Sequence, residues 1–425
     1  MTKNYLEVLS RFALFRDKEA EPGQSSESGG VSVAMDAGSG IKSKLSASHD
    51  GDSVSGSELP TAIYAFAREA SGKLSQEMAK PDFLAFVLAY FFGECSSVLA
   101  GTTAYRHSIS PCQELEPPSF TAVQKRGANI FTERLSGNYI ESFSLELGEG
   151  WVSLSADVTG TGHRQTNYMH EMVTAPANAN SITLSENAVE GDTEAERMAN
   201  VYRVRAKDAG SEVWRLLSIS SVSADTPVVI SFAEPLGTSS DNVDFHVDYI
   251  PEEPAWCSLP GFIDESPLKL TDARLMVDAH YDGSSLQGGE ELAVSLESFS
   301  ISGKNNLEIK RFPGDSGPAA CGLRGKREIT ISLTESLRSS VRQYQADNPD
   351  TEQLSVAFLL QGAEIDEGEG YRFGAEIIFP KVGIMEAPIE TQAGRLAQAG
   401  DLVVMDDGAY GGVLINCFNR QSGYL

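Results

Sequence analysis

The segment from Ile140 to Gly160 restricts the fold more than any other part of this chain. Polar residues alternate with apolar ones on both sides of a Gly-Glu-Gly turn at residues 148–150. The polar set is Ser142, Ser144, Glu146, Ser153, Ser155 and Asp157, and the apolar set is Phe143, Leu145, Leu147, Val152, Leu154, Ala156 and Val158. Because neighbouring side chains of a strand point to opposite faces, this pattern predicts an antiparallel β-hairpin with one apolar and one polar face.

A second segment, Leu296 to Lys310, repeats part of this pattern. Both segments contain Glu-Ser-Phe-Ser, at Glu141–Ser144 and at Glu297–Ser300. In each copy the residue before the Glu is apolar but out of phase with the Phe, which predicts a β-bulge at that place. The following segment, Lys326–Thr334, also alternates and predicts another strand. The chain is therefore expected to be mainly β.

Two segments predict short helices packed on the sheet. The first runs from Pro81 to Gly93, with proline in the first turn and glycine at the end. Its apolar face comprises Phe83, Phe86, Val87, Tyr90 and Phe91. Such a face is expected to lie in the core or at a contact between subunits. The second helix follows Thr334, a suitable N-cap for the segment 335–348.

Composition divides the chain into four parts. Residues 1–60 are expected to form an N-terminal arm or long loop, because residues 17–60 are rich in Ser, Gly, Asp and Glu. Residues 61–161 and 261–425 contain the hairpins and helices of one main domain. Residues 162–260 have strand patterns of their own, at 201–206, 213–219, 228–232 and 245–250. Short strands at this spacing predict an inserted small β-sandwich, immunoglobulin-like in type.

The charge and cysteine content narrow the possible roles. The sequence has 33 Lys and Arg against 60 Asp and Glu, a formal net charge of −27. A strongly acidic protein repels nucleic-acid phosphates, which suits a soluble surface or a channel that DNA passes without adhering. The five cysteines form no CxxC pair, so we expect neither a zinc site nor a redox motif, but reduced thiols. The first residues lack the pattern of a secretory signal, and the apolar run Phe83–Phe92 is too short to span a membrane.

Candidate catalytic and metal-binding motifs are weak. Gly314-Asp315-Ser316-Gly317-Pro318 resembles the nucleophile loop of trypsin-like proteases, but no segment upstream supplies the histidine context, so a turn-rich loop is expected. His163 and His170 lie seven residues apart without a helical pattern, so we expect exposed loop histidines. The acidic turn 366–370 lacks the EF-hand alternation. We therefore expect no enzyme activity, no catalytic residue, no cofactor and no metal site.

The order of the elements resembles the tail-tube proteins of long-tailed bacteriophages and related prophages. The matching segments are Ala70–Gly93, with the strand ASGKLSQEM and the helix PDFLAFVLAYFFG; His107–Gly160, with FTAVQKRG and the first hairpin; and Leu296–Gln345, with SISGKNNLEI and CGLRGKREITISLT. They cover less than a third of the chain. The Ser-rich arm and the segment 162–260 are departures from a minimal tube protein.

This resemblance implies a structural virion protein that self-assembles into stacked, hexameric rings. Hairpins from all subunits would join into one continuous β-barrel around a lumen through which DNA passes during ejection. The resemblance places the polar residues of the first hairpin in the lumen, together with Glu308. It implies other copies of the chain as partners, with tape-measure and tail-terminator or baseplate proteins, and a sheath where the tail has one. Genomic DNA would pass without sequence-specific binding, and no membrane would be involved. The protein would be made in the host bacterial cytoplasm and reside in the virion.

Three other functions remain open at this point. A multidomain β protein that binds a receptor, such as an adhesin, is supported by the segment 162–260 and the acidic surface. Another virion subunit, such as a sheath or capsid protein, would differ mainly in the geometry of assembly. A hydrolase would depend on the Ser316 loop alone.

Overall fold

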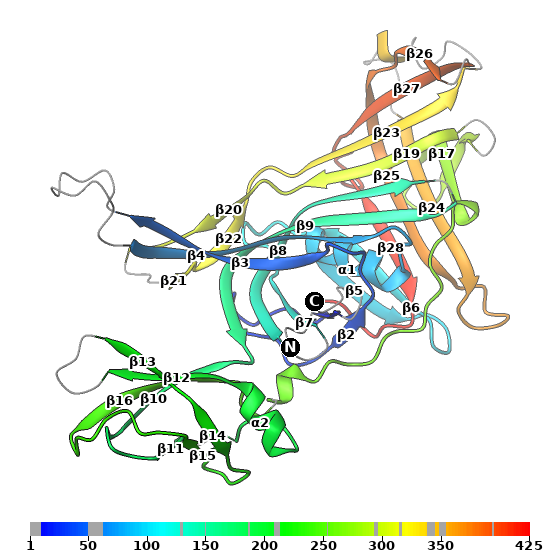
Figure 1. The fold of residues 1–425 in the computed structure, drawn as a ribbon. Coiled ribbons are helices and arrows are strands. Elements are labelled where there is room, and N and C mark those ends of the chain that lie inside the picture. The colour runs from blue at the N-terminus through cyan, green and yellow to red at the C-terminus, as the bar shows by residue number, and fades with distance from the viewer. Residues whose placement is uncertain are drawn as a thin grey trace. The chain divides into compact units, whose positions relative to one another are not determined.

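The computed structural model of the chain is mainly β (Figure 1). It describes residues 10–49, 63–127, 131–148, 150–185, 188–207, 213–252, 254–292, 296–313, 317–337, 345–347, 354–392 and 395–425. The described chain divides into two compact units. The larger contains residues of 11–122, 135–164 and 260–425, and the smaller contains residues of 123–134 and 165–259.

The strands before the smaller unit are β1 (Arg11–Phe15), β2 (Gly30–Val33), β3 (Gly40–His49), β4 (Ile63–Gln76), β5 (Gly93–Leu99), β6 (Tyr105–Pro111), β7 (Phe120–Arg126), β8 (Phe131–Leu147) and β9 (Val152–Thr166). Those after it are β17 (Ala273–Tyr281), β18 (Leu286–Glu291), β19 (Leu296–Lys304), β20 (Leu307–Lys310), β21 (Gly317–Pro318), β22 (Cys321–Arg324), β23 (Glu328–Ser336), β24 (Leu354–Glu364), β25 (Arg372–Glu386), β26 (Ile389–Gln392), β27 (Arg395–Val404) and β28 (Leu414–Asn419). A 3-10 turn, η3 (Leu270–Asp272), precedes β17.

Antiparallel pairing joins most of these strands into one twisted sheet. Strand β3 pairs with β4 and β4 with β9, while β8 pairs with β19, β19 with β23 and β23 with β27. Strands β8 and β9 form the predicted hairpin, closed where the Gly148 N–H donates to the Trp151 carbonyl. Figure 1 shows β8, β9, β19 and β23 as neighbours in the larger unit. In β19 the register shifts between Leu296 and Ser298, so the bulge predicted at Glu297 is confirmed.

The sheet divides at β25. Residues Gly374–Ile378 of β25 pair with β28, whereas Val382–Glu386 pair with β27. On the opposite edge, the part of β25 from Arg372 to Val382 pairs with β24. Pro380 lies between the two stretches, where a residue without an N–H is tolerated because it leaves no ladder bond unmade. Strand β28 continues to β6 and β5, and β24 continues to β17 and β18.

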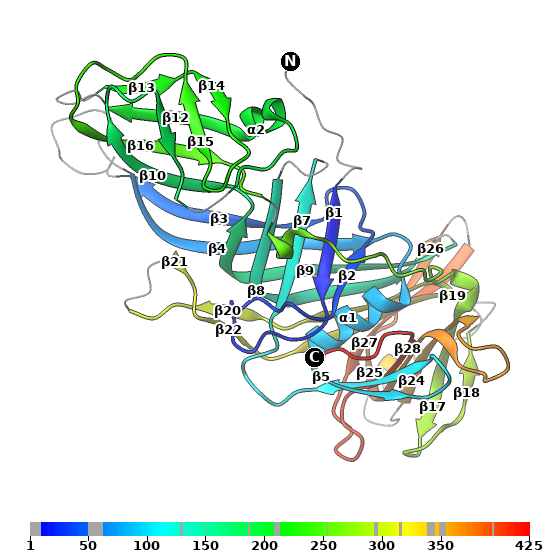
Figure 2. The same ribbon diagram turned by 90° about the horizontal axis from the view of Figure 1, so that it is seen from below.

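Helix α1 (Pro81–Phe92) fills the core of the larger unit (Figure 2). It begins and ends as predicted, with Gly93 in the left-handed conformation at the C-cap. All twelve of its residues are buried, so its apolar surface extends around the whole helix and not along one face. The Phe91 ring meets the Phe143 ring edge-on, with centroids 4.7 Å apart. The helix therefore packs on the apolar face of β8.

Polar side chains complete the C-terminal end of α1. The Asn305 amide donates to the Phe91 carbonyl at 3.1 Å, and the Arg327 guanidinium donates to the carbonyls of Phe91 and Phe92 at 3.2 and 3.1 Å. The same guanidinium lies over both phenylalanine rings. These bonds satisfy carbonyl groups that have no partner inside the helix.

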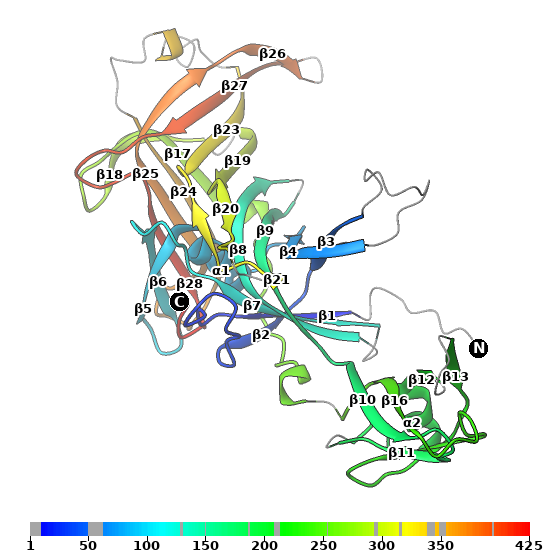
Figure 3. The same cartoon turned by 90° about the vertical axis from the view of Figure 1, so that its left-hand side faces the viewer.

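The arm expected for residues 1–60 is not a loop where it is described. Strands β1, β2 and β3 belong to the main sheet, and Leu14, Val31 and Ile41 are buried in its core. Between β1 and β2 the buried Glu19 carboxylate accepts bonds from the Gly23 and Gly137 N–H groups and from two hydroxyl groups. Strands β3 and β4 form a long hairpin whose end projects from the rest of the larger unit (Figure 3).

The second predicted helix does not begin at Thr334. Residues up to Ser336 continue strand β23, paired with β27 through Ser336. Of the remaining expected helix, residues 338–344 and 348 lie outside the described residues, and residues 345–347 are helical.

The smaller unit contains two sheets and a core of its own. One sheet has the order β10 (Met169–Pro176), β16 (Asn242–Tyr249), β12 (Val201–Lys207) and β13 (Trp214–Leu217). The other contains β11 (Ser181–Thr183), β15 (Val229–Phe232) and β14 (Ile219–Val222). Helix α2 (Glu194–Asn200) begins with a capping box at Thr193, and a 3-10 turn, η2 (Ala255–Cys257), follows β16. The immunoglobulin-like topology stays a prediction.

Candidate functional site: the polar face of the main sheet

The strands of the first hairpin have one buried and one accessible face, as the alternation predicted. Phe143, Leu145, Leu154 and Ala156 are at most 3% exposed. The six polar residues of the hairpin, Ser142, Ser144, Glu146, Ser153, Ser155 and Asp157, are all partly or fully exposed. The predicted set therefore shares one face of the sheet. We call this face, as it continues over β4, β9, β8, β19 and β23, the polar face.

Hydroxyl groups form a row across the centre of the polar face. Ser75 on β4 lies opposite Ser155 on β9. Ser144 on β8 lies opposite Ser302 on β19, which in turn lies opposite Thr330 on β23. Directly opposed residues of an antiparallel pair point to the same side, so these short side chains make one continuous strip. The strip is polar, uncharged and free of long side chains.

A parallel row carries charges of both signs. Lys73 on β4 lies opposite Asp157 on β9, whose carboxylate accepts a bond of 2.8 Å from the Ser142 hydroxyl. Lys304 on β19 lies opposite Ser142 on one side and opposite Glu328 on the other. Each lysine of the row thus has an acidic residue as a cross-strand neighbour, an arrangement that stabilises a strand pair modestly.

The two rows border a shallow hollow of 370 Å³ over β8, β9, β19 and β23. It is lined by Ser142, Phe143, Ser144, Ser155, Asp157, Ser302, Gly303, Lys304, Glu328 and Thr330. Beyond this hollow, the Ser332 hydroxyl donates to the Asp401 carboxylate at 2.6 Å, and Lys44 on β3 lies opposite Glu69 on β4. The surface offers hydrogen-bonding groups and charges of both signs, without the basic stripe that nucleic-acid binding requires.

The lysines of the polar face were missed by sequence reasoning. Lys73 and Lys304 lie outside the hairpin, on β4 and β19, the strands that pair with its two edges. Their positions could have been found from alternation, since Lys73 follows Ser71 and precedes Ser75, and Lys304 follows Ser302. The face therefore carries lysines as well as the carboxylates of the hairpin.

Glu308 is not on the polar face. Its strand, β20, pairs with β22 in a separate two-stranded sheet, and the true partner of β19 is β23. The Glu308 carboxylate forms an ion pair with Lys310 at 2.5 Å, and Arg311 pairs with Glu69 at 3.6 Å. These basic residues thus have acidic neighbours, and they lie outside the set of residues that line the hollow.

The predicted helix face lies in the core of the larger unit. Phe83, Phe86, Val87, Tyr90 and Phe91 are each at most 1% exposed and belong to the main cluster of buried side chains. The Phe86, Tyr90 and Phe120 rings pack together, with centroids 4.6 to 5.3 Å apart. The Tyr90 hydroxyl donates to the Arg16 carbonyl at 3.0 Å.

The weaker sequence motifs show structural roles where they are described. Residues 314–316 of the Gly-Asp-Ser-Gly-Pro segment lie outside the described residues, and Gly317–Pro318 form β21, parallel to β4. In the acidic turn, the Asp366 carboxylate accepts bonds from the hydroxyl and N–H of Thr103 and from the Ala104 N–H. These bonds, led by the Thr103 hydroxyl, lower the pKa of Asp366.

His163 and His170 are not loop residues. His163 lies on β9 and His170 on β10. Among the described residues, no group of three or more His, Cys, Asp or Glu side chains is arranged to bind a metal ion. The five cysteines are free thiols. Within the same part of the chain, every helix is too short or too polar to cross a membrane.

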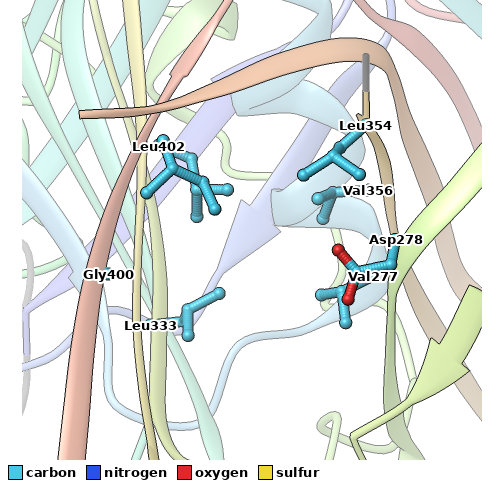
Figure 4. A pocket seen from close by; sticks show the side chains of 8 residues that line it. Val277, Asp278, Leu333, Leu354, Val356, Gly400 and Leu402 are labelled. Atoms are coloured by element: carbon cyan, nitrogen blue, oxygen red, sulfur yellow. The ribbon is translucent and has the colours of Figure 1, made fainter. Parts of the chain in front are cut away.

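A small apolar cavity lies elsewhere in the larger unit (Figure 4). Its walls are the side chains of Val277, Leu333, Leu354, Val356, Ile384 and Leu402, with Gly400 and the Asp278 carboxylate beside them. Its volume is 10 Å³, enough for about one water molecule. It is too small for a substrate or cofactor.

Comparison with known proteins gives little information about the family or function of this chain. No protein-family model matches the sequence, and no curated protein matches it. Among solved structures, a double mutant of the Hcp1 protein from E. coli EAEC 042 pathovar is similar with 12% sequence identity over 34% of this chain and 96% of that chain. The TM-score is 0.18, so this similarity supports no statement about fold or function.

Proposed function

We propose that this chain is a structural virion protein whose copies assemble into stacked, hexameric rings and form a phage tail tube. The observation that carries the proposal is the polar face: an extended antiparallel sheet with one side buried under α1 and the other covered by short hydroxyl side chains. A half-polar sheet that joins equivalent sheets of other subunits would enclose a water-filled lumen without exposed strand edges. The resemblance in element order to tail-tube proteins gives the same arrangement.

The chemistry of the polar face suits a wall along which DNA slides. Serine and threonine side chains are too short to reach base edges, and each lysine of the charged row has an acidic cross-strand neighbour. Phosphate binding depends on unpaired Lys and Arg groups that release counterions, and a balanced row provides few of these. The proposal therefore includes passage of genomic DNA without sequence-specific binding, and no catalytic role.

The projecting end of the β3–β4 hairpin supports assembly with further copies. Leu45, Ile63, Tyr64 and Phe66 are 49 to 78% exposed there. Large apolar side chains gathered on a surface indicate a site of protein contact. In a ring stack the partners would be other copies of this chain, with tape-measure and terminator or baseplate proteins at the ends, in the virion.

The proposal is tested by electron microscopy combined with labelling of the polar face. In a background with Cys95 and Cys321 replaced by serine, Ser144→Cys and Ser284→Cys variants are treated with a small maleimide and with a bulky polymer-linked maleimide. Ser284 lies on the exposed turn between β17 and β18 and is the matched control. We expect hollow rings or tubes at rising concentration, in which the Ser144→Cys thiol reacts with the small reagent only.

Equal access of both reagents to the Ser144→Cys thiol inside assembled particles would refute a lumenal position for the polar face. Closed shells or contractile jackets would favour a capsid or sheath subunit. The adhesin alternative predicts a chain that remains monomeric at high concentration and binds to bacterial cells, with binding lost on removal of surface glycans.

A further inference from the structure

Two histidines of the smaller unit lie side by side on one face of its four-stranded sheet. His170 is on β10 and His246 is on β16, and the Nδ1 atom of His246 is 3.2 Å from the Nε2 atom of His170. The register pairs His170 with Asp248 and Met172 with His246, so the two imidazoles are diagonal neighbours. The ring centroids are 5.2 Å apart. The contact depends on strand pairing, because the residues are 76 positions apart in sequence.

Asp248 determines which nitrogen of His170 is available. Its Oδ1 atom lies 2.6 Å from the Nδ1 atom of His170, and its other oxygen bonds the Arg203 guanidinium. An ionised carboxylate accepts a hydrogen bond and cannot donate one, so Nδ1 of His170 carries a hydrogen, and in the neutral imidazole Nε2 has the lone pair. A carboxylate bonded to the far nitrogen is the usual outer partner of a metal-binding histidine.

We propose that the Nε2 atom of His170 and the Nδ1 atom of His246 chelate one divalent transition-metal ion, of the class of Cu²⁺, Ni²⁺ or Zn²⁺. Metal–imidazole bonds are roughly 2.0–2.1 Å long, so two nitrogens 3.2 Å apart would subtend an angle of roughly 100° at the ion. That angle lies between the square-planar and tetrahedral arrangements these ions adopt. Imidazole ligands exclude the hard ions Ca²⁺ and Mg²⁺, which require oxygen.

Binding requires a change of tautomer at His246 and no net loss of protons. Without metal, Nδ1–H of His246 donates to Nε2 of His170. With metal, the His246 proton resides on its Nε2 atom, and both imidazoles rotate so that their lone pairs turn from each other toward an ion beside the line that joins the two nitrogens. The His170 side chain is 47% exposed, which leaves the remaining coordination positions open to water.

The surrounding charges neither favour nor prevent a cation. Arg203 and Arg205 lie opposite Asp248 and His246 on β12. Asp244 and Asp248 flank His246 on its own strand and offset these guanidinium groups. The affinity would therefore come from the two metal–nitrogen bonds, and it should follow the order of imidazole affinity, with Cu²⁺ tightest.

The test uses the untagged full-length chain, because a histidine tag would bind the same ions. Binding of Cu²⁺, Ni²⁺ and Zn²⁺ is measured by isothermal titration calorimetry on the wild-type chain and on His170→Ala, His246→Ala and Asp248→Asn variants. We expect each alanine variant to lose at least about tenfold in affinity, and Asp248→Asn to lose about 10- to 100-fold as outer-partner changes do. His280→Ala, an exposed strand histidine of β17, is the matched control and should bind as the wild type does.

Trp214 supplies a second, local readout. Its ring meets the His246 ring edge-on with centroids 4.8 Å apart, so Cu²⁺ at this site should quench its fluorescence. Trp214→Phe should remove that quenching, while Trp151 and Trp256 remain as internal references. The proposal is overturned if the His170→Ala/His246→Ala double variant binds all three ions as tightly as the wild type. It is equally overturned if the wild-type chain binds none of them. Neither result depends on whether the chain forms tubes.

Discussion

Glu265 should make the stability of the larger unit depend on pH. Its carboxyl group is 4% exposed, and its Oε2 atom accepts a bond of 3.0 Å from the Asp82 N–H at the start of α1. Burial, and then repulsion from the Asp82 carboxylate, raises the pKa of Glu265 from 4.5 to about 7. The Asp82 carboxylate accepts a hydrogen bond of 2.6 Å from the Tyr424 hydroxyl.

The direction of the effect follows from proton linkage. Between pH 4.5 and about 7 the folded state binds a proton at Glu265 that the unfolded state has lost. The contribution of this proton to the free energy of unfolding is therefore complete below pH 4.5 and is lost as the pH rises through 7. At 1.36 kcal/mol per pKa unit, the charged carboxylate costs the fold about 3 kcal/mol at pH 8.

The Glu265→Gln variant isolates this contribution, because glutamine stays neutral and its side-chain carbonyl can accept the same Asp82 N–H. We expect the variant and the wild type to unfold together near pH 4.5. At pH 8 the variant should be more stable by up to about 3 kcal/mol, with a melting temperature at least about 5 °C higher. Differential scanning calorimetry of the unassembled chain at both pH values measures the difference, and the smaller unit contributes equally to both proteins.

Glu290→Gln is the matched control, because that side chain is exposed on β18 and should give no difference that changes with pH. The reasoning is refuted if Glu265→Gln changes the melting temperature equally at pH 4.5 and pH 8. It is also refuted if the variant is the less stable protein at pH 8.

Three further substitutions test the packing that supports the polar face. Gly303→Ala would place a Cβ atom 2.4 Å from the Phe143 ring and 2.6 Å from the Phe91 ring, so it should destabilise the unit by about 1–3 kcal/mol in urea unfolding. Phe91→Ala removes a fully buried ring from the helix–sheet contact and should cost about 3–5 kcal/mol by the same assay; an unchanged midpoint would contradict that packing. Glu19→Ala leaves buried donors such as the Gly137 N–H without an acceptor and should cost more than about 3 kcal/mol, with faster amide exchange in β8 as the local readout.

The sequence predicted best those elements whose signals are local. The hairpin of residues 140–160 alternates with period two in both strands, and burial in the structure follows that alternation at every position from Ser142 to Glu146. Helix α1 has a proline in its first turn and a glycine after its last, so its bounds could be predicted to the residue. Helix α1 was also expected to lie in the core or at a subunit contact, and its place in the core is confirmed. Its whole circumference is buried, because β strands and the C-terminal Tyr424 surround it.

The N-terminal strands could not be predicted from composition. Strands β1 and β2 are five and four residues long, and β2 lies within the segment 17–60 that is rich in Ser, Gly and acidic residues. Each is too short to be stable by local propensity, and their pairing with each other and with the sheet supplies the stability. The buried Glu19 stabilises the turn between them. Its carboxylate accepts hydrogen bonds from Ser119, Thr121 and Gly137, all more than 90 residues away in sequence. No local pattern signals such a residue.

The predicted position of Glu308 on the polar face was wrong for a similar reason, because contacts between distant segments decide where its strand pairs. A strand that follows another after a short turn is expected to pair with it, since sequential strands usually do. Here the chain turns at Asn305 and Asn306 after β19. Strand β20 does not pair with β19 but with β22 in the small sheet, and β23 pairs with β19 instead. The Asn305 side chain explains the divergence: its amide donates to the carbonyls of Phe91 and Ile140, so the turn is anchored to α1 and β8. A contact between three distant segments decides the pairing.

The net charge of −27 is a sum over the whole chain, whereas a passing polyanion would meet one face of it. On the polar face Lys73 lies opposite Asp157 and Lys304 opposite Glu328, so charges of opposite sign are neighbours within a strand spacing of about 5 Å. That strand spacing is shorter than the screening length of about 8 Å at physiological ionic strength, so the field of each lysine is partly offset by that of its acidic neighbour. Under the proposed function, DNA would pass because each lysine has an acidic cross-strand neighbour that offsets its attraction for phosphate. Repulsion from a uniformly acidic wall is not needed, and the serines between the pairs keep the wall hydrated without offering a fixed partner.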